Sequence, residues 1–306
     1  MRILVAGELN LDLILQNYLS FPALGQETLV EDITLTLGSS GAICAAGLAK
    51  LGNDVSFTGK LGCDSWGDAC LDFLAKLHVE SSRVVRDAAV KTGITVSISG
   101  PRDRAMVTYL GAMEAMQAAE IAARGWDGLN HLHVSSIFLQ RALRPDLKQL
   151  LAEAHAHGLT TSLDPGFDPQ ERWGHDVIDT LAEVDVFLPN EVELAGITGL
   201  SDPEPALRSL ENGRTRTVAK LGRNGCATLD SGKLLTVPAF AVQAVDTTGA
   251  GDSFNAGFLH AWLRKSPLID ALRFGAACGA ISTLASGGTT AQASEQQVRE
   301  LCGDRP

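Results

Sequence analysis

The second half of the chain alternates between strand-like and helix-like segments, and this alternation constrains the fold more than any other feature. Short apolar runs at 131–138, 160–164 and 184–188 are typical of buried strands, and helical patterns over 144–157 and 176–183 separate them. Such alternation predicts βαβ units, in which parallel strands form one sheet with helices on both faces. The 306 residues are enough for one large domain of this kind.

Nearer the N-terminus the pattern changes to strands with a single apolar face. Residues 31–37 and 92–99 alternate apolar with polar side chains, and 104–110 is expected to pair with 92–99 across a turn at 100–103. Strands with one polar face do not suit the middle of a parallel sheet that helices cover on both sides. The sequence therefore predicts a second, smaller sheet, separate from the first.

Composition limits the classes of partner. The formal net charge is −11, whereas a nucleic-acid surface usually needs a basic stripe. An anionic substrate stays compatible with this charge, because backbone dipoles bind phosphate even on acidic proteins. Polar residues at Glu8, Asn10 and Asp12 interrupt the first apolar run, no apolar stretch approaches membrane-spanning length, and the six cysteines are scattered. We expect a cytoplasmic protein with free thiols and with no nucleic-acid or membrane partner.

The stretch from Val245 to Phe254 carries the strongest chemical signal. Asp246-Thr247-Thr248 is predicted to end a strand, Gly249-Ala250-Gly251 to form a turn, and Asp252 to open a helix. Unpaired N–H groups at such a turn, together with the helix dipole, favour a bound phosphate. A carboxylate beside that phosphate can accept the proton of an attacking hydroxyl. The alternative is structural: Asp252 caps the helix, and the small residues let it pack closely on the sheet.

The string Asp-Thr-Thr-Gly-Ala-Gly-Asp at 246–252 resembles the C-terminal signature of the PfkB carbohydrate kinases, the ribokinase-like family. The resemblance implies a three-layer α/β/α fold with a mostly parallel central sheet and a small β-sheet lid. It makes Asp252 the catalytic base and the backbone of 249–251 the anion hole. It also implies a monovalent-cation site at Asp246 and Thr248, and hence activation by K⁺.

By the same resemblance, residues 1–306 form one kinase domain, with lid strands inserted at about 12–37 and 90–112. Closure of the lid would exclude water, which otherwise competes with the acceptor for the phosphoryl group. The exposed edges of a lid sheet can also pair between two copies. A homodimer through the lid is therefore an expectation.

Two early motifs are expected to bind the substrate. Gly7 and Asn10-Leu11-Asp12 resemble the family motif in which the Asp binds sugar hydroxyls, although Asp12 is equally a common turn residue. The stretch 38–43 resembles the Gly-Gly-x-Gly-Ala-Asn substrate loop, with Ser39 in place of the second Gly and Ile43 in place of the Asn. Loss of that amide removes a partner for a hydroxyl, so a preference for ribose does not carry over. The substrate residues implied are Asn10, Asp12, Gly38, Ser39, Ser40, Gly41 and Ile43.

Three further segments resemble the nucleotide side of the family. Asn190 and Glu193 match its Asn-x-x-Glu pair, which organises Mg²⁺ and phosphates largely through water, and they also suit a helix capping box. The Leu-Gly-x-x-Gly loop and the glycine stop after the last small-residue helix give the remaining nucleotide residues, Lys220, Gly222, Gly225 and Gly287. Residues 164–169 resemble a looser form of the Asp-x-Asn-x-Arg segment, and no role follows from them.

These motifs predict a kinase that uses ATP and Mg²⁺ to phosphorylate a hydroxymethyl-type alcohol of a small sugar. One alternative is a nucleoside kinase of the same fold, which the apolar Ile43 favours. A second alternative is a ligand-binding regulator that keeps the fold without turnover. The acid at Asp252 argues against the regulator, since a protein that only binds has no physical need for a base.

Overall fold

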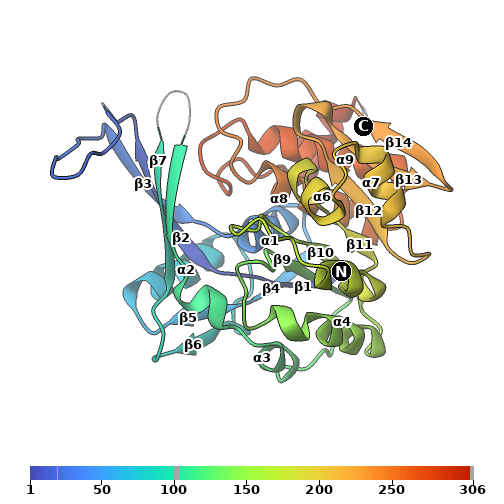
Figure 1. Cartoon of the computed structure of the whole chain (residues 1–306), viewed down its shortest axis with the longest axis horizontal. Helices are drawn as coiled ribbons and strands as arrows, with labels where there is room; N and C mark the ends of the chain where they lie inside the picture. Colours follow the sequence, from blue (N-terminus) through green and yellow to red (C-terminus); the bar gives the residue numbers. More distant parts are fainter. Residues whose placement is uncertain (19, 100–103, 304–306) are drawn as a thin grey trace.

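The computed structural model describes residues 1–18, 20–99 and 104–303, so the turn expected at 100–103 lies outside the described residues. Among the described residues, eight strands form the central sheet in the order β14-β13-β12-β11-β10-β9-β1-β4 (Figure 1). Pairing is parallel from β4 through β12 and antiparallel for β13 and β14. The bounds are β1 Arg2–Ala6, β4 Asp54–Thr58, β9 His131–Ser135, β10 Thr160–Asp164, β11 Val186–Phe187, β12 Arg216–Lys220, β13 Cys226–Asp230 and β14 Lys233–Val237.

Helices cover both faces of this sheet, because successive side chains of each buried strand point to opposite sides. In β1, Ile3 and Val5 pack into one apolar core, whereas Leu4 and Ala6 pack into the other. The first core lies under α1 Ser40–Lys50, α2 Ser65–Lys76, α8 Ala250–Leu263 and α9 Leu268–Ser282. The second lies under α3 Ala118–Ala122, α4 Leu147–Ala156, α5 Asp176–Thr180, α6 Glu191–Thr198 and α7 Pro203–Ser209.

Shorter elements complete the two layers. The helix α10 (Glu295–Cys302) packs on α9, and β5 (Lys60–Gly62) pairs with β6 (Val85–Asp87) in a small separate ribbon. Single 3₁₀ turns occur at Gly111–Ala115, Arg144–Asp146, Leu181–Glu183 and Gly222–Asn224. The sequence predicts continuous helices over 144–157 and 176–183. In the structure the turn at Arg144–Asp146 precedes α4, and the turn at Leu181–Glu183 follows α5. The predicted fold class, a mostly parallel sheet between helical layers with a smaller sheet beside it, is confirmed.

The smaller sheet is the lid sheet, defined here as β3-β2-β7-β8, and it stands away from the body of the molecule (Figure 1). Its strands are β2 Asn10–Gln16, β3 Asp32–Leu37, β7 Gly93–Ser99 and β8 Arg104–Tyr109. The register aligns apolar residues across all four strands: Leu13 lies opposite Leu35 and Val96, and Val96 lies opposite Val107. The other face carries polar residues such as Asp12, so the sheet has one apolar and one polar face.

The prediction that residues 246–248 end a strand is wrong. These residues form an irregular loop, and α8 begins at Ala250 with Gly249 as its N-cap at φ = +73°. Glycine adopts this left-handed conformation without the steric penalty that a side chain brings. Asp252 is consequently the third residue of the helix and not its cap, which leaves its carboxylate available for other contacts.

Candidate active site

The parallel strands of the central sheet end at a common edge, and their ends carry polar residues. Glu8 follows β1, Ser136 follows β9, Asp164 ends β10, Asn190 follows β11 and Lys220 ends β12. Ligands of open α/β sheets bind outside this carboxyl edge. The fold therefore gathers at one place five residues that lie up to about two hundred positions apart in the sequence.

A buried ion pair lies at the centre of this edge. Lys220 Nζ is 2.6 Å from Asp164 Oδ2, and it also donates to Asn255 Oδ1 at 3.3 Å. The Asn255 amide donates to the same Asp164 oxygen, so both groups are held in place. Lys220 is 9% exposed, although a lysine at the end of a strand is ordinarily solvated. Sequence reasoning missed Asn255, although its position three residues after Asp252 places both on one face of α8.

Two more carboxyl groups, those of Asp252 and Glu193, interact electrostatically with this ion pair. Burial raises the pKa of Asp252 to about 8, with the Asp164 charge adding to the shift. Burial likewise raises the pKa of Glu193 to about 7. Burial also opposes ionisation of Asp164, but the Lys220 ammonium holds the pKa of that carboxyl below its usual value. The site thus has three carboxyl groups around one lysine, and a deficit of positive charge.

The turn before α8 is the predicted anion hole. The Ala250 amide donates to Thr247 O at 3.2 Å, whereas none of the described residues accepts a hydrogen bond from the amides of Gly249 and Gly251. A Cβ placed on Gly251 would lie 3.5 Å from Lys220 Nζ, so the turn borders the ion pair. Gly249 and Gly251 therefore offer donors next to a cation, and Ala250 offers one only after its bond to Thr247 breaks.

Ile43 lies under this turn. A Cβ on Gly249 would approach two Ile43 side-chain carbons to 3.0 Å, and one on Gly288 would approach Ile43 Cδ1 to 2.4 Å. Ile43 is 5% exposed and does not line the cavity described below. The structure thus places Ile43 as packing beneath the anion hole, whereas the resemblance made it a substrate contact.

Asn190 and Glu193 form the capping box that the sequence predicts for α6. The Asn190 side chain accepts from the amides of Val192 and Glu193, and Glu193 Oε2 accepts from Asn190 N at 2.8 Å. Glu193 Oε1 accepts from Asn190 Nδ2 at 2.7 Å. Both carboxylate oxygens are engaged, which suits contact with a cation through its water shell better than direct ligation. The shortage of positive charge around Asp164, Glu193 and Asp252 fits a divalent cation at this edge.

A cavity of about 1150 Å³ lies between the lid sheet and the carboxyl edge. Glu8, Ser40 and Ser136 form part of its wall, and the Ser40 side chain lies close enough to Asp252 to favour the ionised form of that carboxyl group. The lid contributes residues of its polar face, namely Asn10, Asp12, Thr95, Met106 and Thr108. The cavity therefore reaches from beneath the lid to the neighbourhood of the candidate base.

Apart from Ile43, the predicted substrate residues fall into two groups. Asn10, Asp12, Ser39 and Ser40 line the cavity. Gly38 and Gly41 do not, but each permits a close approach that a side chain would block. A Cβ on Gly38 would lie 2.3 Å from Asp12 Oδ1, and one on Gly41 would lie 2.6 Å from Ser135 Oγ.

The outer wall of the cavity carries aromatic and cationic groups. Phe138 and Phe167 meet the Trp173 ring edge-on, each with ring centroids 5.5 Å apart. The Arg144 guanidinium binds Asp176 at 2.6 Å and stacks over the Phe138 ring. Two further arginines line this wall: Arg141 pairs with Glu114, and Arg172 has no ion pair within the described ranges.

The loops after β12, before α8 and after α9 carry the remaining predicted residues. Asp246 Oδ1 accepts from Thr248 N and Oγ1, and Oδ2 accepts from Gly287 N at 2.9 Å. Asp246 therefore ties the loop before α8 to the loop after α9, and its role in binding a monovalent cation stays a prediction. Gly222 and Gly225 both have positive φ, and a Cβ on Gly225 would lie 1.9 Å from Val237 O. Gly225 lets the chain pass close to β14, whereas a Cβ on Gly222 would meet only Glu191 Oε1, at 4.0 Å.

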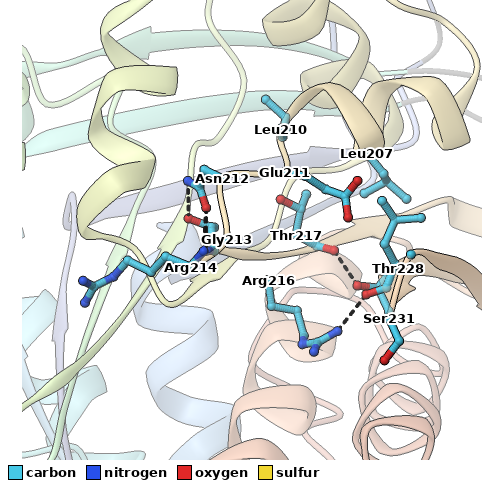
Figure 2. Close-up of a pocket in the computed structure, with 13 residues that line it drawn as sticks. Leu207, Leu210, Glu211, Asn212, Gly213, Arg214, Arg216, Thr217, Thr228 and Ser231 are labelled. Carbon is cyan, nitrogen blue, oxygen red and sulfur yellow. Dashed lines mark hydrogen bonds between the residues drawn. The ribbon is translucent and has the colours of Figure 1, made fainter.

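A second cavity, of about 400 Å³, lies at the opposite end of β12 (Figure 2). Its wall carries Asn212, Arg214 and Arg216, whereas Lys220 ends the strand at the active-site edge. Arg216 donates to Leu229 O, and Arg214 contacts Asp185. Both arginines of this cavity therefore already have protein partners.

The described residues contain no group of three or more His, Cys, Asp or Glu side chains arranged to hold a metal ion. They also contain no helix of the length and apolarity that crossing a membrane requires.

An eight-stranded α/β layer beneath a small β-sheet is the architecture of ribokinase-fold kinases, and solved ribokinases share it along the whole chain. The ribokinase of Thermotoga maritima superposes with a TM-score of 0.83 at 23% identity, covering 99% of both chains. That of Arabidopsis thaliana, solved with ribose and ATP, gives 0.83 at 24% identity, covering 98% of both. Residues 1–295 match the pfkB family carbohydrate kinases, and the chain belongs to that family.

Two relatives of known name indicate the class of kinase to which the protein belongs. An ATP-dependent ribose-1-phosphate kinase of Halopiger xanaduensis is 32% identical over 297 residues, covering 95% of this chain and 94% of that protein. A fructokinase of Klebsiella pneumoniae is 32% identical over 279 residues, covering 83% and 88%. The protein is accordingly an enzyme, a sugar or nucleoside kinase of the ribokinase family.

Proposed function

We propose that this kinase transfers the γ-phosphate of ATP to a hydroxymethyl-type alcohol of a small sugar, with Asp252 as the general base. The observation that carries the proposal is the placement of Asp252. It lies one residue after the turn at 249–251, and its pKa, raised by burial to about 8, is near the working pH. A group whose pKa matches the operating pH takes up and releases a proton efficiently.

In the proposed reaction the acceptor hydroxyl gives its proton to Asp252 while its oxygen attacks the γ-phosphorus. The bond from that phosphorus to the bridging oxygen breaks, and ADP leaves. The amides of Gly249 and Gly251 stabilise charge on the transferred group, and Ala250 joins them once it releases Thr247. The lid sheet closes over the acceptor and excludes water.

The nucleotide is assigned to the β12 side of the same edge. Lys220 and Asn190 would lie near its phosphates, and the loops at Gly222, Gly225 and Gly287 would border the rest of the molecule. Mg²⁺, when bound through water at Asn190 and Glu193, neutralises phosphate charge. We assign a K⁺ site to Asp246 and Thr248 in the loop that precedes the anion hole.

The test is an ADP-release assay over free sugars, sugar phosphates and nucleosides, each with and without K⁺. Sugar phosphates are included because three arginines, Arg141, Arg144 and Arg172, line the outer cavity wall. We expect Mg²⁺-dependent turnover of at least one sugar acceptor, with higher rates in K⁺. Binding of ligands without ADP release from any acceptor would contradict the proposal and favour the non-catalytic regulator.

A nucleoside acceptor is the second candidate, and a specific observation favours it. Phe138 and Phe167 both line the cavity, and Phe167 is 49% exposed. An exposed aromatic ring in a substrate cavity offers a stacking surface for a base. A higher kcat/KM for adenosine than for any sugar in the same assay would establish this function instead.

We further propose that two copies associate through the apolar face of the lid sheet. That face is exposed at the sheet edges, where Ile33 is 58%, Val107 65% and Tyr109 53% exposed. Continuous apolar patches of this kind mark association surfaces, and the two-fold pairing of identical patches is the commonest arrangement.

We expect Ile33→Asp to convert a wild-type dimer into a monomer, because a carboxylate would be buried against apolar side chains without a partner. Thr34→Asp is the matched control, since Thr34 lies next to it on the opposite face of β3. Sedimentation velocity at micromolar concentration measures the outcome. A wild-type monomer, or a Thr34→Asp variant that dissociates as readily, would rule out this interface.

A further inference from the structure

Glu8 is a buried carboxyl group for which the proposed mechanism has no use. It follows β1, is 3% exposed, and lines the cavity beside Asn10 and Asp12. Its Oε1 atom accepts from the Ser40 amide at 2.9 Å. Its Oε2 atom is buried and has no hydrogen-bond partner among the described residues. A buried polar atom without a partner is costly, and in a ligand cavity it points to contact with the ligand.

The surroundings of Glu8 determine its protonation state. Burial raises its pKa to about 8, and the Asp252 charge on α8 adds to this, whereas the hydrogen bond from the Ser40 amide on α1 and the nearby Ser136 side chain after β9 act to lower it. Asp12 of β2 shares the cavity wall, and Lys220 of β12 is paired with Asp164. Because Oε1 already accepts a hydrogen bond, the proton belongs on Oε2, which makes Glu8 a donor at neutral pH.

We propose that Glu8 is a specificity residue of the proposed kinase, whose neutral carboxyl group donates a hydrogen bond from Oε2 to a hydroxyl oxygen of the acceptor. This inference rests on the proposed function, because it assigns the acceptor to this cavity. A hydroxyl group both donates and accepts. Asp12 offers acceptor oxygens, Asn10 offers both kinds of group, and Glu8 supplies a donor, so the wall matches a polyol with adjacent hydroxyls.

The first test compares Glu8→Gln with Glu8→Met. The carboxamide keeps a donor on one atom and an acceptor for the Ser40 amide on the other, whereas Met keeps only the volume. At pH 7 we expect Glu8→Gln to hold the acceptor KM within about 3-fold of wild type. Glu8→Met should raise it by roughly 10–100-fold, with the ATP KM unchanged, because the acceptor hydroxyl loses a buried partner.

The pH dependence of the acceptor KM distinguishes two roles for Glu8. In the first role Glu8 is protonated and donates a hydrogen bond to the acceptor, and in the second it is ionised and only caps the N-terminus of α1. The wild-type KM should rise above about pH 8, as Glu8 loses its proton, and the Glu8→Gln KM should stay level over that range. A Glu8→Gln variant as impaired as Glu8→Met would overturn the proposal. Parallel pH profiles for the wild type and Glu8→Gln would also overturn it.

Thermal unfolding provides a readout that does not depend on turnover. A carboxyl whose folded pKa is raised stabilises the fold fully below its unfolded pKa, and that contribution is lost as pH rises through about 8. The Tm of Glu8→Gln minus the Tm of wild type should therefore increase between pH 6 and pH 9. We call this increase the gain. Glu80→Gln is the control, because the pKa of Glu80 is lowered and its variant should show no such gain. A Tm difference between Glu8→Gln and wild type that does not change with pH would overturn the assignment of a neutral carboxyl group to Glu8. If the gain is observed but no acceptor causes ADP release, only the proposed function is overturned.

Discussion

Asp252→Asn should lower kcat by roughly 10²–10⁴-fold, the range over which a general base contributes to catalysis. The amide keeps the shape of the side chain but cannot take the proton of the attacking hydroxyl. ATP affinity should change little, because the Gly249 and Gly251 amides belong to the backbone. Steady-state kinetics with the acceptor found in the panel, together with nucleotide binding by calorimetry, measures both quantities.

The pH profile and a control sharpen this prediction. Since the pKa of Asp252 is raised to about 8, wild-type kcat/KM should fall as pH drops below that value, and the residual activity of Asp252→Asn should lack this limb. Asp202→Asn serves as a control, because Asp202 also lies at a helix start but caps the remote α7. Turnover by Asp252→Asn within about 3-fold of wild type would exclude the proposed base.

Lys220→Met should destabilise the protein by about 3–5 kcal/mol, the cost of breaking a buried ion pair by removing one partner. The Lys220 ammonium acts on three carboxyl groups, at Asp164, Glu193 and Asp252. Its loss removes from this edge the one cation that the described structure places against all three. Urea denaturation followed by circular dichroism measures the change in the free energy of unfolding.

Asp164→Asn should cost less than Lys220→Met, because the lysine then keeps two other carboxyl partners. The double variant should be less destabilised than the sum of the two single variants, since each residue's main partner is already gone. A Lys220→Met protein within about 1 kcal/mol of wild type, or strict additivity in this cycle, would show that the 2.6 Å contact stabilises little.

The sequence predicted the fold class and the glycine turn that precedes α8 because both depend on local patterns. Helix and strand periodicity over 131–188 is a property of neighbouring residues, and so are the glycines at 249 and 251. The capping box of Asn190 and Glu193 was likewise visible, because its two partners lie three residues apart. The strand predicted at 246–248 failed because Asp246 bonds a distant loop at Gly287 instead of a neighbouring strand.

The roles of Lys220, Asp164 and Glu8 depended on the tertiary structure alone. Lys220 and Asp164 are 56 positions apart, and a lysine at a strand end is ordinarily solvated, so only packing against α8 shows that the pair is buried. In the sequence, nothing distinguishes Glu8 from any other polar residue that follows a strand. Its neutral state follows from desolvation, which is set by how completely other elements enclose a side chain and has no signature in neighbouring residues. The sequence by itself determined the glycine turn that we propose as the anion hole, because that turn is a local pattern, and the tertiary structure decided which charged groups lie around it.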